Sequence, residues 1–263
     1  MFGYFLYRNA WRFDNAPHKE VELSDDIVSK LLHTKGWLLR NTFDFDQKRE
    51  SEFWYVIKDS FDGLNELSSS MRVHVRKALK NYEYKVVDDN FLIDNAYHIY
   101  EKSMNGYKIK DRSISKKNFY KIFRTECECW GCFSKTDGKL VGFAVNYLWS
   151  NCCQYEYTAI IPECKNDNTY PYYGLFYSMN QYYLGEKKMK YVCDGSRTIT
   201  KHSNIQEFLI HNFKFRKAYC KLKIFYKWWL NVVIKALFPF RNIIPFRNIR
   251  AILRMEEYSR SSQ

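Results

Sequence analysis

Two acidic residues occupy positions from which a folded chain could transfer protons. Glu156 lies in "CCQYEYTAIIPE", a run rich in aromatic and β-branched residues that predicts a strand. A carboxylate in so tyrosine-rich a strand is a candidate general base, and a solvent-facing charge on an edge strand is the alternative. Asp194 closes the predicted strand "MKYVCDG". Strand ends in α/β sheets commonly face the ligand crevice, although Asp-Gly also suits a plain turn.

Three further polar residues extend this candidate site. His202 precedes the last predicted helix and could act as an acid or a base, but Ser203 and Asn204 beside it are ordinary helix-capping residues. Arg72 and Arg76 lie four residues apart on a predicted helix, so they share one face. Their guanidinium groups suit phosphate or carboxylate, and a solvated cationic face is the alternative.

Predicted helices and strands alternate along the chain that carries these residues. Two β-rich runs, 36–45 and 52–59, are expected to form a strand pair, and apolar spacing predicts a helix over 64–81. The order continues with a strand over 82–89, helices over 91–105 and 116–130, a hairpin over 131–148, a strand over 152–163, a helix over 170–188, a strand over 189–195, a helix over 204–213 and a strand over 214–226. This order predicts an α/β layer around a partly antiparallel sheet.

Three segments carry a resemblance to a known family. They are "L-x4-R-x3-R-K-A" from Leu67 to Ala78, "YEYTAIIPE" followed by "YPYYGLFY", and "IQEFLIHNFKFRKAY". Their order and spacing resemble the GNAT acyltransferase superfamily from Leu67 to Tyr226. They resemble most its Fem-like branch, whose better-known members add amino acids to peptidoglycan precursors. Other members are encoded among surface-polysaccharide genes.

The resemblance implies both a fold and a donor site. The fold class is α/β (α+β), a GNAT-like mixed central sheet flanked by helices, with a β-rich N-terminal extension and a basic amphipathic C-terminal tail. A thioester or aminoacyl donor would enter where the central strands splay, with its phosphates at the next helix N-terminus. The implied donor-binding residues are Ile160, Ile161, Tyr172, Tyr173 and Gly174. Arg72 and Arg76 stand where the family pattern has Arg, and together with Lys217 they are the candidate substrate-binding residues.

The donor loop departs from the family pattern. The loop "NDNTYPYYGL" has less Gly than the usual GNAT loop and lacks its leading cation or Gln. This departure weakens the expectation of ordinary acetyl-CoA binding. The alternative is that Pro171 and Gly174 merely open a helix.

The chemistry implied by the family is acyl transfer to an amine. It needs a base for the amine proton, donors for the oxyanion and an acid for the leaving group. Glu156, Asp194 and His202 are the catalytic candidates. The leading hypothesis is an acyltransferase that uses acyl-CoA, expected to be acetyl-CoA, without a metal. Its acceptor would be an amine of a cell-envelope or surface-polysaccharide precursor.

Two other functions compete with this hypothesis. An aminoacyl-tRNA-dependent transferase would suit the cations and aromatic residues, although no separate coiled-coil arm for tRNA is visible. A noncatalytic nucleic-acid-binding protein would show steep salt dependence and no turnover. The position of the charge argues against both functions. RNA binding requires cations near the cleft, whereas here they are concentrated in the C-terminal tail.

Positive charge is concentrated in the C-terminal fifth of the chain. The formal net charge is +13, and residues 214–263 hold twelve Lys and Arg against two Glu. We expect three parts: a β-rich segment over 1–62, a GNAT-like domain over 63–226 and a basic amphipathic tail over 227–263. The tail fits the surface of an anionic membrane, and it fits an oligomer interface or a packed final helix nearly as well. Membrane contact would hold the enzyme near a lipid-linked acceptor.

The cysteines and the lengths of the apolar runs bear on the cellular compartment of the protein. The first residues do not read as a signal peptide, and no spanning helix is expected, because no apolar stretch reaches the ~18 residues that one needs. The eight cysteines are therefore expected to be reduced in the cytoplasm, with the protein there or at the inner leaflet. Cys127, Cys129 and Cys132 cluster in "CECWGC", but they lack paired ligand spacing, so buried thiols are favoured over a zinc site.

Overall fold

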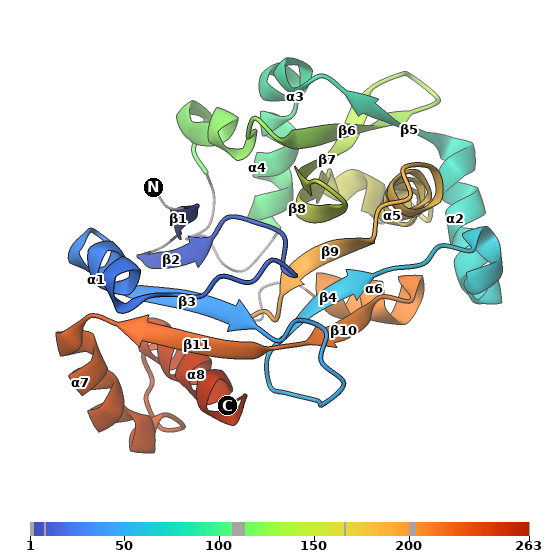
Figure 1. Cartoon of the computed structure of the whole chain (residues 1–263). Coiled ribbons are helices and arrows are strands. Elements are labelled where there is room, and N and C mark those ends of the chain that lie inside the picture. The colour runs from blue at the N-terminus through green and yellow to red at the C-terminus, as the bar shows by residue number, and fades with distance from the viewer. Residues whose placement is uncertain (1–2, 8, 107–113, 166, 200–203, 263) are drawn as a thin grey trace. The chain divides into compact units, whose positions relative to one another are not determined.

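The computed structural model describes residues 3–7, 9–106, 114–165, 167–199 and 204–262 (Figure 1). The chain divides into two compact units. The site unit consists of Val56–Gly195 and His202–Arg216, and the terminal unit of Met1–Tyr55, Ser196–Lys201 and Lys217–Gln263. The three parts predicted from the sequence, with boundaries at residues 62 and 226, divide the chain differently from these two units. They stay a prediction.

One mixed sheet carries most strands of the site unit. Its order is β10-β4-β9-β8-β7-β6-β5. The strands are β4 (Trp54–Lys58), β5 (Tyr82–Val87), β6 (Cys127–Ser134), β7 (Leu140–Trp149), β8 (Cys152–Ile160), β9 (Tyr191–Ser196) and β10 (Arg216–Tyr219). β5 to β8 form an antiparallel meander, whereas β8 and β9 are parallel. The predicted α/β fold with a partly antiparallel sheet is confirmed.

The helices of the site unit follow the apolar periodicity of the sequence. They are α2 (Ser69–Asn81), α3 (Asp89–Asn95), α4 (Tyr97–Asn105), α5 (Pro171–Asn180) and α6 (Ile205–Phe213). α2 begins where the Ser68 side chain accepts the Met71 N–H, and α5 has Pro171 in its first turn. The predicted helix over 116–130 is wrong in its second half. Only Lys116–Ile122 is helical, as a 3-10 turn, and Cys127 already pairs with Tyr147 in the sheet.

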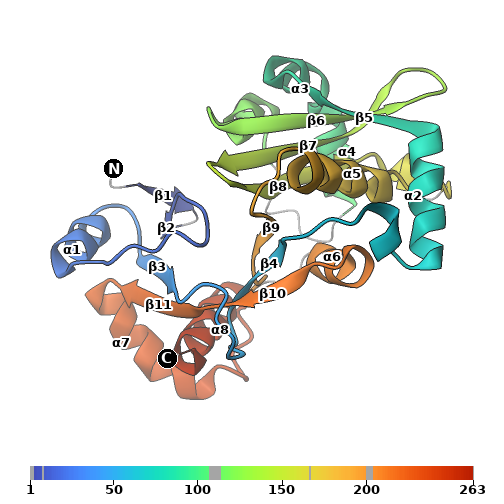
Figure 2. The same ribbon diagram turned by 45° about the vertical axis from the view of Figure 1, so that its right-hand side comes forward.

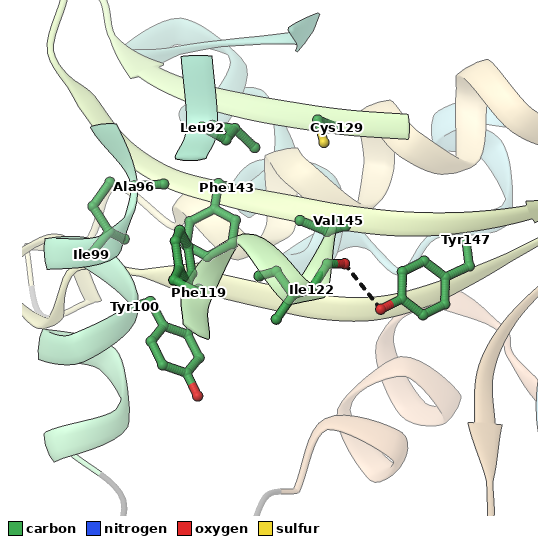
Figure 3. Close-up of a cluster of buried hydrophobic side chains, with 11 residues drawn as sticks. Leu92, Ala96, Ile99, Tyr100, Phe119, Ile122, Cys129, Phe143, Val145 and Tyr147 are labelled. Carbon is green, nitrogen blue, oxygen red and sulfur yellow. Dashed lines mark hydrogen bonds between the residues drawn. The ribbon is translucent and has the colours of Figure 1, made fainter. Parts of the chain in front are cut away.

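A buried cluster fills one face of this sheet (Figure 3). Phe143, Val145 and Tyr147 alternate along β7 and point to that face. Leu92 of α3, Ile99 and Tyr100 of α4, and Ala96 between the two helices cover it together with Phe119 and Ile122. The Tyr147 hydroxyl donates to the Ile122 carbonyl at 3.0 Å, which ties the 3-10 turn to the strand.

α5 covers the opposite face of the sheet. Asn146 lies between Val145 and Tyr147 and donates its amide to the Met179 sulfur at 3.2 Å. The Tyr155 hydroxyl of β8 donates to Asn180 Oδ1 at 2.9 Å. α5 then continues as a π-helical turn over Gln181–Glu186, a feature that often marks functional sites.

The terminal unit has a second sheet with the order β1-β2-β3-β11 (Figure 2). Its strands are β1 (Tyr4–Tyr7), β2 (Ala10–Phe13), β3 (Leu38–Phe43) and β11 (Lys221–Tyr226), and its helices are α1 (Asp25–His33), α7 (Trp228–Leu237) and α8 (Arg247–Ser261). The predicted pairing of 36–45 with 52–59 is wrong, because β3 pairs with β2 and β11, while β4 joins the other sheet.

The predicted strand over 214–226 divides into two strands. β10 lies at the edge of the seven-stranded sheet, and β11 belongs to the four-stranded one. Lys214 closes α6 in the left-handed conformation, with φ of 59° and its N–H on the Leu209 carbonyl. Gly is the residue that most commonly adopts this left-handed conformation after a helix, and Lys adopts it here at some conformational cost.

Gly174 of α5 gives a testable consequence of the packing. A Cβ at this residue would lie 2.3 Å from the Tyr84 hydroxyl oxygen, and that hydroxyl is fixed by donating to the Pro171 carbonyl at 3.1 Å. We expect Gly174→Ala to lower the free energy of unfolding by about 1–3 kcal/mol, measured by urea denaturation.

The matched control for this variant is Gly185→Ala, where the nearest atom, in Phe61, lies 3.4 Å from the new Cβ. That change should be close to neutral. In a Tyr84→Ala background the cost of Gly174→Ala should vanish. An equal cost in both backgrounds would show that Tyr84 is not the reason.

Candidate active site

The parallel strands β8 and β9 separate at the candidate catalytic residues. Their pairing runs from Cys152 opposite Tyr191 to Gln154 opposite Cys193 and ends there. β8 nevertheless continues to Ile160 alongside β7. Beyond Gln154, the β8 backbone groups that faced β9 therefore lose their strand partner, and unpaired N–H groups of this kind can bind a developing oxyanion.

Glu156 sits in a β-bulge at this separation. Tyr155 lies opposite Asn146 and Tyr157 opposite Val145, so Glu156 is the extra residue of β8. Regular alternation across "QYEYT" would place Tyr155 and Tyr157 on one face of the sheet. The bulge separates them instead: Tyr155 lies on the α5 face, whereas Tyr157 packs against the cluster on the other face. Glu156 is exposed, and the Gln154 side-chain amide donates to its carboxylate.

Asp194 is the first residue of β9 beyond the pairing with β8. Its side chain is half-buried. Burial raises the pKa of Asp194 well above its usual range, and the negative charge of Glu156 raises it further, while a hydrogen bond from Gln206 opposes both. The structure thus brings the two predicted carboxyl groups into electrostatic contact, with one exposed and the other favoured in its neutral form.

The third catalytic candidate, His202, lies outside the described residues, so its role stays a prediction. Gln206 is a neighbour of Asp194 that sequence reasoning missed. It is buried in the first turn of α6, and its side-chain amide reaches the Asp194 carbonyl at 3.4 Å. The sequence signal that could have identified Gln206 is its position in "NIQEF", in the first turn of the helix predicted to follow Asp194.

The predicted donor-binding residues are engaged in packing. Ile160 is fully buried, and the Ile161 N–H donates to the Val141 carbonyl at 2.9 Å. Tyr172 stacks on Phe176 with ring centroids 6.4 Å apart. Tyr173 meets Phe208 edge-on at 5.0 Å, and Gly174 accommodates Tyr84. The donor role of these five residues stays a prediction.

β5 and α2 hold the loop that precedes α5. The Tyr82 hydroxyl hydrogen-bonds with Thr169 Oγ1 at 2.6 Å. The His74 ring stacks on Tyr170 at 4.0 Å, and Lys77 lies 5.6 Å from the same ring. The predicted donor loop and the cationic helix are thus brought together by His74, a residue that sequence reasoning missed.

The predicted anion-binding residues fall in both units. Arg72 donates to Ser69 Oγ at 3.3 Å, and Arg76 is exposed on the same helix of the site unit. Lys217 belongs to the terminal unit, where its ammonium lies 4.4 Å from the centroid of Trp54. Their role in binding stays a prediction.

The cysteines are free thiols. Burial raises the pKa of Cys132, Cys153 and Cys193, which disfavours the thiolate form. Within the described ranges, no group of three or more His, Cys, Asp or Glu could hold a metal ion. In that same part of the chain, no helix is long and apolar enough to cross a bilayer.

Comparisons with known proteins bear on the fold. No family model matches the sequence, and no curated protein sequence matches it either. Among solved structures, FemX matches with a TM-score of 0.55 at 11% identity, over 74% of this chain and 73% of that chain. L-PGS from Bacillus licheniformis matches with a TM-score of 0.55 at 10% identity, over 99% of this chain and 86% of that chain.

A tandem GNAT protein from the clavulanic acid biosynthesis pathway also matches, with a TM-score of 0.41 at 8% identity over 76% of this chain and 66% of that chain. The likeness to FemX and L-PGS, with TM-scores of 0.55, shows that the chain has a fold related to that of the Fem-like transferases, as the sequence predicted. Likeness at this identity shows the fold alone.

Proposed function

We propose that the chain is an acyltransferase that moves an acyl group from acyl-CoA, expected to be acetyl-CoA, to an amine of a cell-envelope or surface-polysaccharide precursor. The observation that carries this proposal is the carboxyl pair at the separation of β8 and β9, beside backbone that has lost its strand partner. The GNAT-like fold supports the reaction class by analogy.

Each carboxyl group has a distinct part in the proposed reaction. The exposed Glu156 takes a proton from the acceptor amine as it attacks the acyl carbonyl, and Gln154 orients its carboxylate. Backbone N–H groups of β8 beyond Gln154 stabilise the tetrahedral oxyanion. Asp194, favoured in its neutral form, gives a proton to the leaving group as the bond to the acyl carbon breaks. Proton return from Glu156 to Asp194 resets the pair.

Binding measurements with acetyl-CoA and with aminoacyl-tRNA, run side by side on the full chain, test the donor class. The proposal predicts that acetyl-CoA binds at sub-millimolar concentration and is turned over with an amine acceptor. Binding of charged tRNA alone would favour the aminoacyl-transferase alternative. Binding of neither would contradict a transferase function.

We further propose that the terminal unit docks peripherally on an anionic membrane. Large apolar side chains are exposed between α7 and the start of α8. This apolar tail surface consists of Trp228, Trp229, Val232, Val233, Phe240, Ile243 and Phe246. Trp228 is 81% and Ile243 76% exposed, which is unusual for residues of this size.

The exposed side of α7 is largely apolar. The polar residues Lys227, Asn231 and Lys235 recur every four positions, but only Lys235 is exposed, because Lys227 donates to the Thr34 carbonyl at 2.8 Å and Asn231 is half-buried. The inner side holds Leu230 and Ile234 in a buried cluster with α8. α7 therefore packs through one apolar side and presents a second, for which a lipid interface is a suitable medium.

The charge around this surface complements anionic lipid. Residues 216–255 contain no Asp or Glu, and the exposed cations there include Lys223, Lys235, Arg247 and Arg250. Each basic residue near an anionic bilayer contributes about 1 kcal/mol. A surface that is both apolar and cationic fits the interface of an anionic membrane better than it fits a polar protein partner.

We expect flotation with vesicles that contain phosphatidylglycerol and little flotation with purely phosphatidylcholine vesicles. Trp228→Ala should weaken partitioning by about 10- to 100-fold, since an inserted large apolar side chain contributes about 1.5–3 kcal/mol and each ~1.4 kcal/mol is a factor of ten. Tyr120→Ala, at a residue of the site unit that is 55% exposed, is the matched control. Equal flotation of both variants, or no flotation of the unaltered chain, would refute this docking. Deleting the tail is a poorer test, because Met255 and Tyr258 of α8 pack in the core of the terminal unit.

A further inference from the structure

Two arginines lie side by side in the four-stranded sheet. Arg12 of β2 is directly opposite Arg40 of β3 in a parallel pairing. Ala10 and Leu38, each two residues earlier in its strand, pack in one cluster with Met255 and Tyr258. Because side chains alternate along a strand, both arginines point to this same face, and like charges so placed repel each other.

Neither arginine has an acidic partner in the described part of the chain. Both side chains are half-buried. Arg40 Nε is a buried donor that has no hydrogen-bond acceptor among the described residues. The two guanidinium groups lie against aromatic rings. Arg40 lies 5.4 Å from the centroid of Phe53, and Arg12 lies 5.7 Å from Phe5 and 5.8 Å from Tyr7.

The surroundings of Arg40 disfavour its charge. Burial lowers the pKa of Arg40 to about 10, and the positive charge of Arg12 contributes to this lowering. Among its neighbours, Tyr226 donates its hydroxyl to Glu256 at 2.9 Å, and that carboxylate is paired with Arg260 at 2.8 Å. The nearby acid is therefore already compensated. A half-buried pair of cations without a counter-charge is costly unless an anion completes it.

We infer that Arg12 and Arg40 form a binding site for an oxyanion, either a phosphate or a carboxylate group of a small molecule. Paired guanidinium groups match the geometry of both, through parallel N–H···O bonds. The aromatic rings beside them hold the guanidinium planes by cation–π contact. This site lies within the terminal unit, and its existence does not depend on acyl transfer.

The test uses the full chain and three probes, namely inorganic phosphate, glucose 1-phosphate and acetate, each compared with chloride at equal ionic strength. We expect at least one probe to raise the melting temperature and to bind in titration calorimetry with one site per chain. Arg12→Gln should weaken that binding at least tenfold. Arg12→Lys keeps the positive charge but loses the forked guanidinium group, so it should weaken binding to an intermediate degree.

Arg49→Gln is the matched control, because Arg49 is an exposed arginine of the same unit. It should leave binding unchanged. The inference is overturned if no probe binds more tightly than chloride, or if Arg49→Gln weakens binding as much as Arg12→Gln. If Arg12→Gln fails to fold, as judged by circular dichroism, the binding affinities of Arg12→Lys and Arg49→Gln are compared instead. Weaker binding by Arg12→Lys alone supports the inference, and equal binding by the two variants overturns it. Preference among the probes separates a phosphate site from a carboxylate site.

Discussion

Replacing Glu156 by Gln is expected to lower kcat by about 10²–10⁴-fold, because Gln keeps the shape of the side chain but cannot accept the amine proton. The bulge leaves this side chain exposed at the point where β8 and β9 part. An exposed residue of this kind contributes little to packing. The melting temperature should therefore change by no more than a few degrees.

The matched control is Glu163→Gln. Glu163 is an exposed carboxylate beyond the end of the same strand, paired with Lys102 at 2.8 Å. Its replacement should leave kcat within about twofold of the unaltered chain, as expected for a surface ion pair. Steady-state rates of acyl transfer measure both variants. Full activity of Glu156→Gln would remove this residue from the mechanism.

Replacing Asp194 by Asn should have opposite effects on turnover and on stability. The ordinary pKa of an Asp carboxyl is about 3.9, and burial and the charge of Glu156 raise the pKa of Asp194 in the native state. As the pH rises from about 4 through the native pKa, the unfolded chain releases this proton before the native one does. Stability therefore falls with rising pH in this window, by about 1.4 kcal/mol for each unit of the shift.

Asn carries no such proton, so the stability of Asp194→Asn relative to the unaltered chain should rise as the pH increases above about 4, the ordinary pKa of an Asp carboxyl. Its kcat should fall by about 10²–10⁴-fold, because the leaving group loses its acid. Urea denaturation across this pH range and steady-state rates measure the two effects.

Asp137→Asn is the control, since its hydrogen bonds with Lys139 hold the pKa of Asp137 at about 2, below the window. It should show no such gain. Parallel stability curves for Asp194→Asn and the unaltered chain would contradict a native pKa above the usual range.

Local sequence signals predicted the elements that position the site. The hairpin turning at Asp137–Gly138, the strand ended by Pro162 and the helix entered through Pro171 all rest on residues that restrict the backbone. Hence β8, α5 and β9 were expected in the right order. The expectation that central strands separate near the site came from the resemblance to the GNAT superfamily and not from these local signals.

Properties that depend on two distant segments were not predicted. The bulge at Glu156 becomes visible only when β8 is counted against β7, because alternation within "QYEYT" looks regular. β3 and β4 look like neighbours in sequence, but they belong to different sheets, and their partners include strands from residues 191–226. The opposition of Arg12 and Arg40 likewise follows from a parallel register that neither strand encodes alone.

The central claim is that the separation of β8 and β9 binds the acyl donor. Hydrogen–deuterium exchange of the full chain, with and without saturating donor, tests it most directly. The account predicts slower exchange at residues 155–161 of β8 and its end when acetyl-CoA binds. Unchanged exchange there with bound donor, or protection confined to the terminal unit, would contradict it.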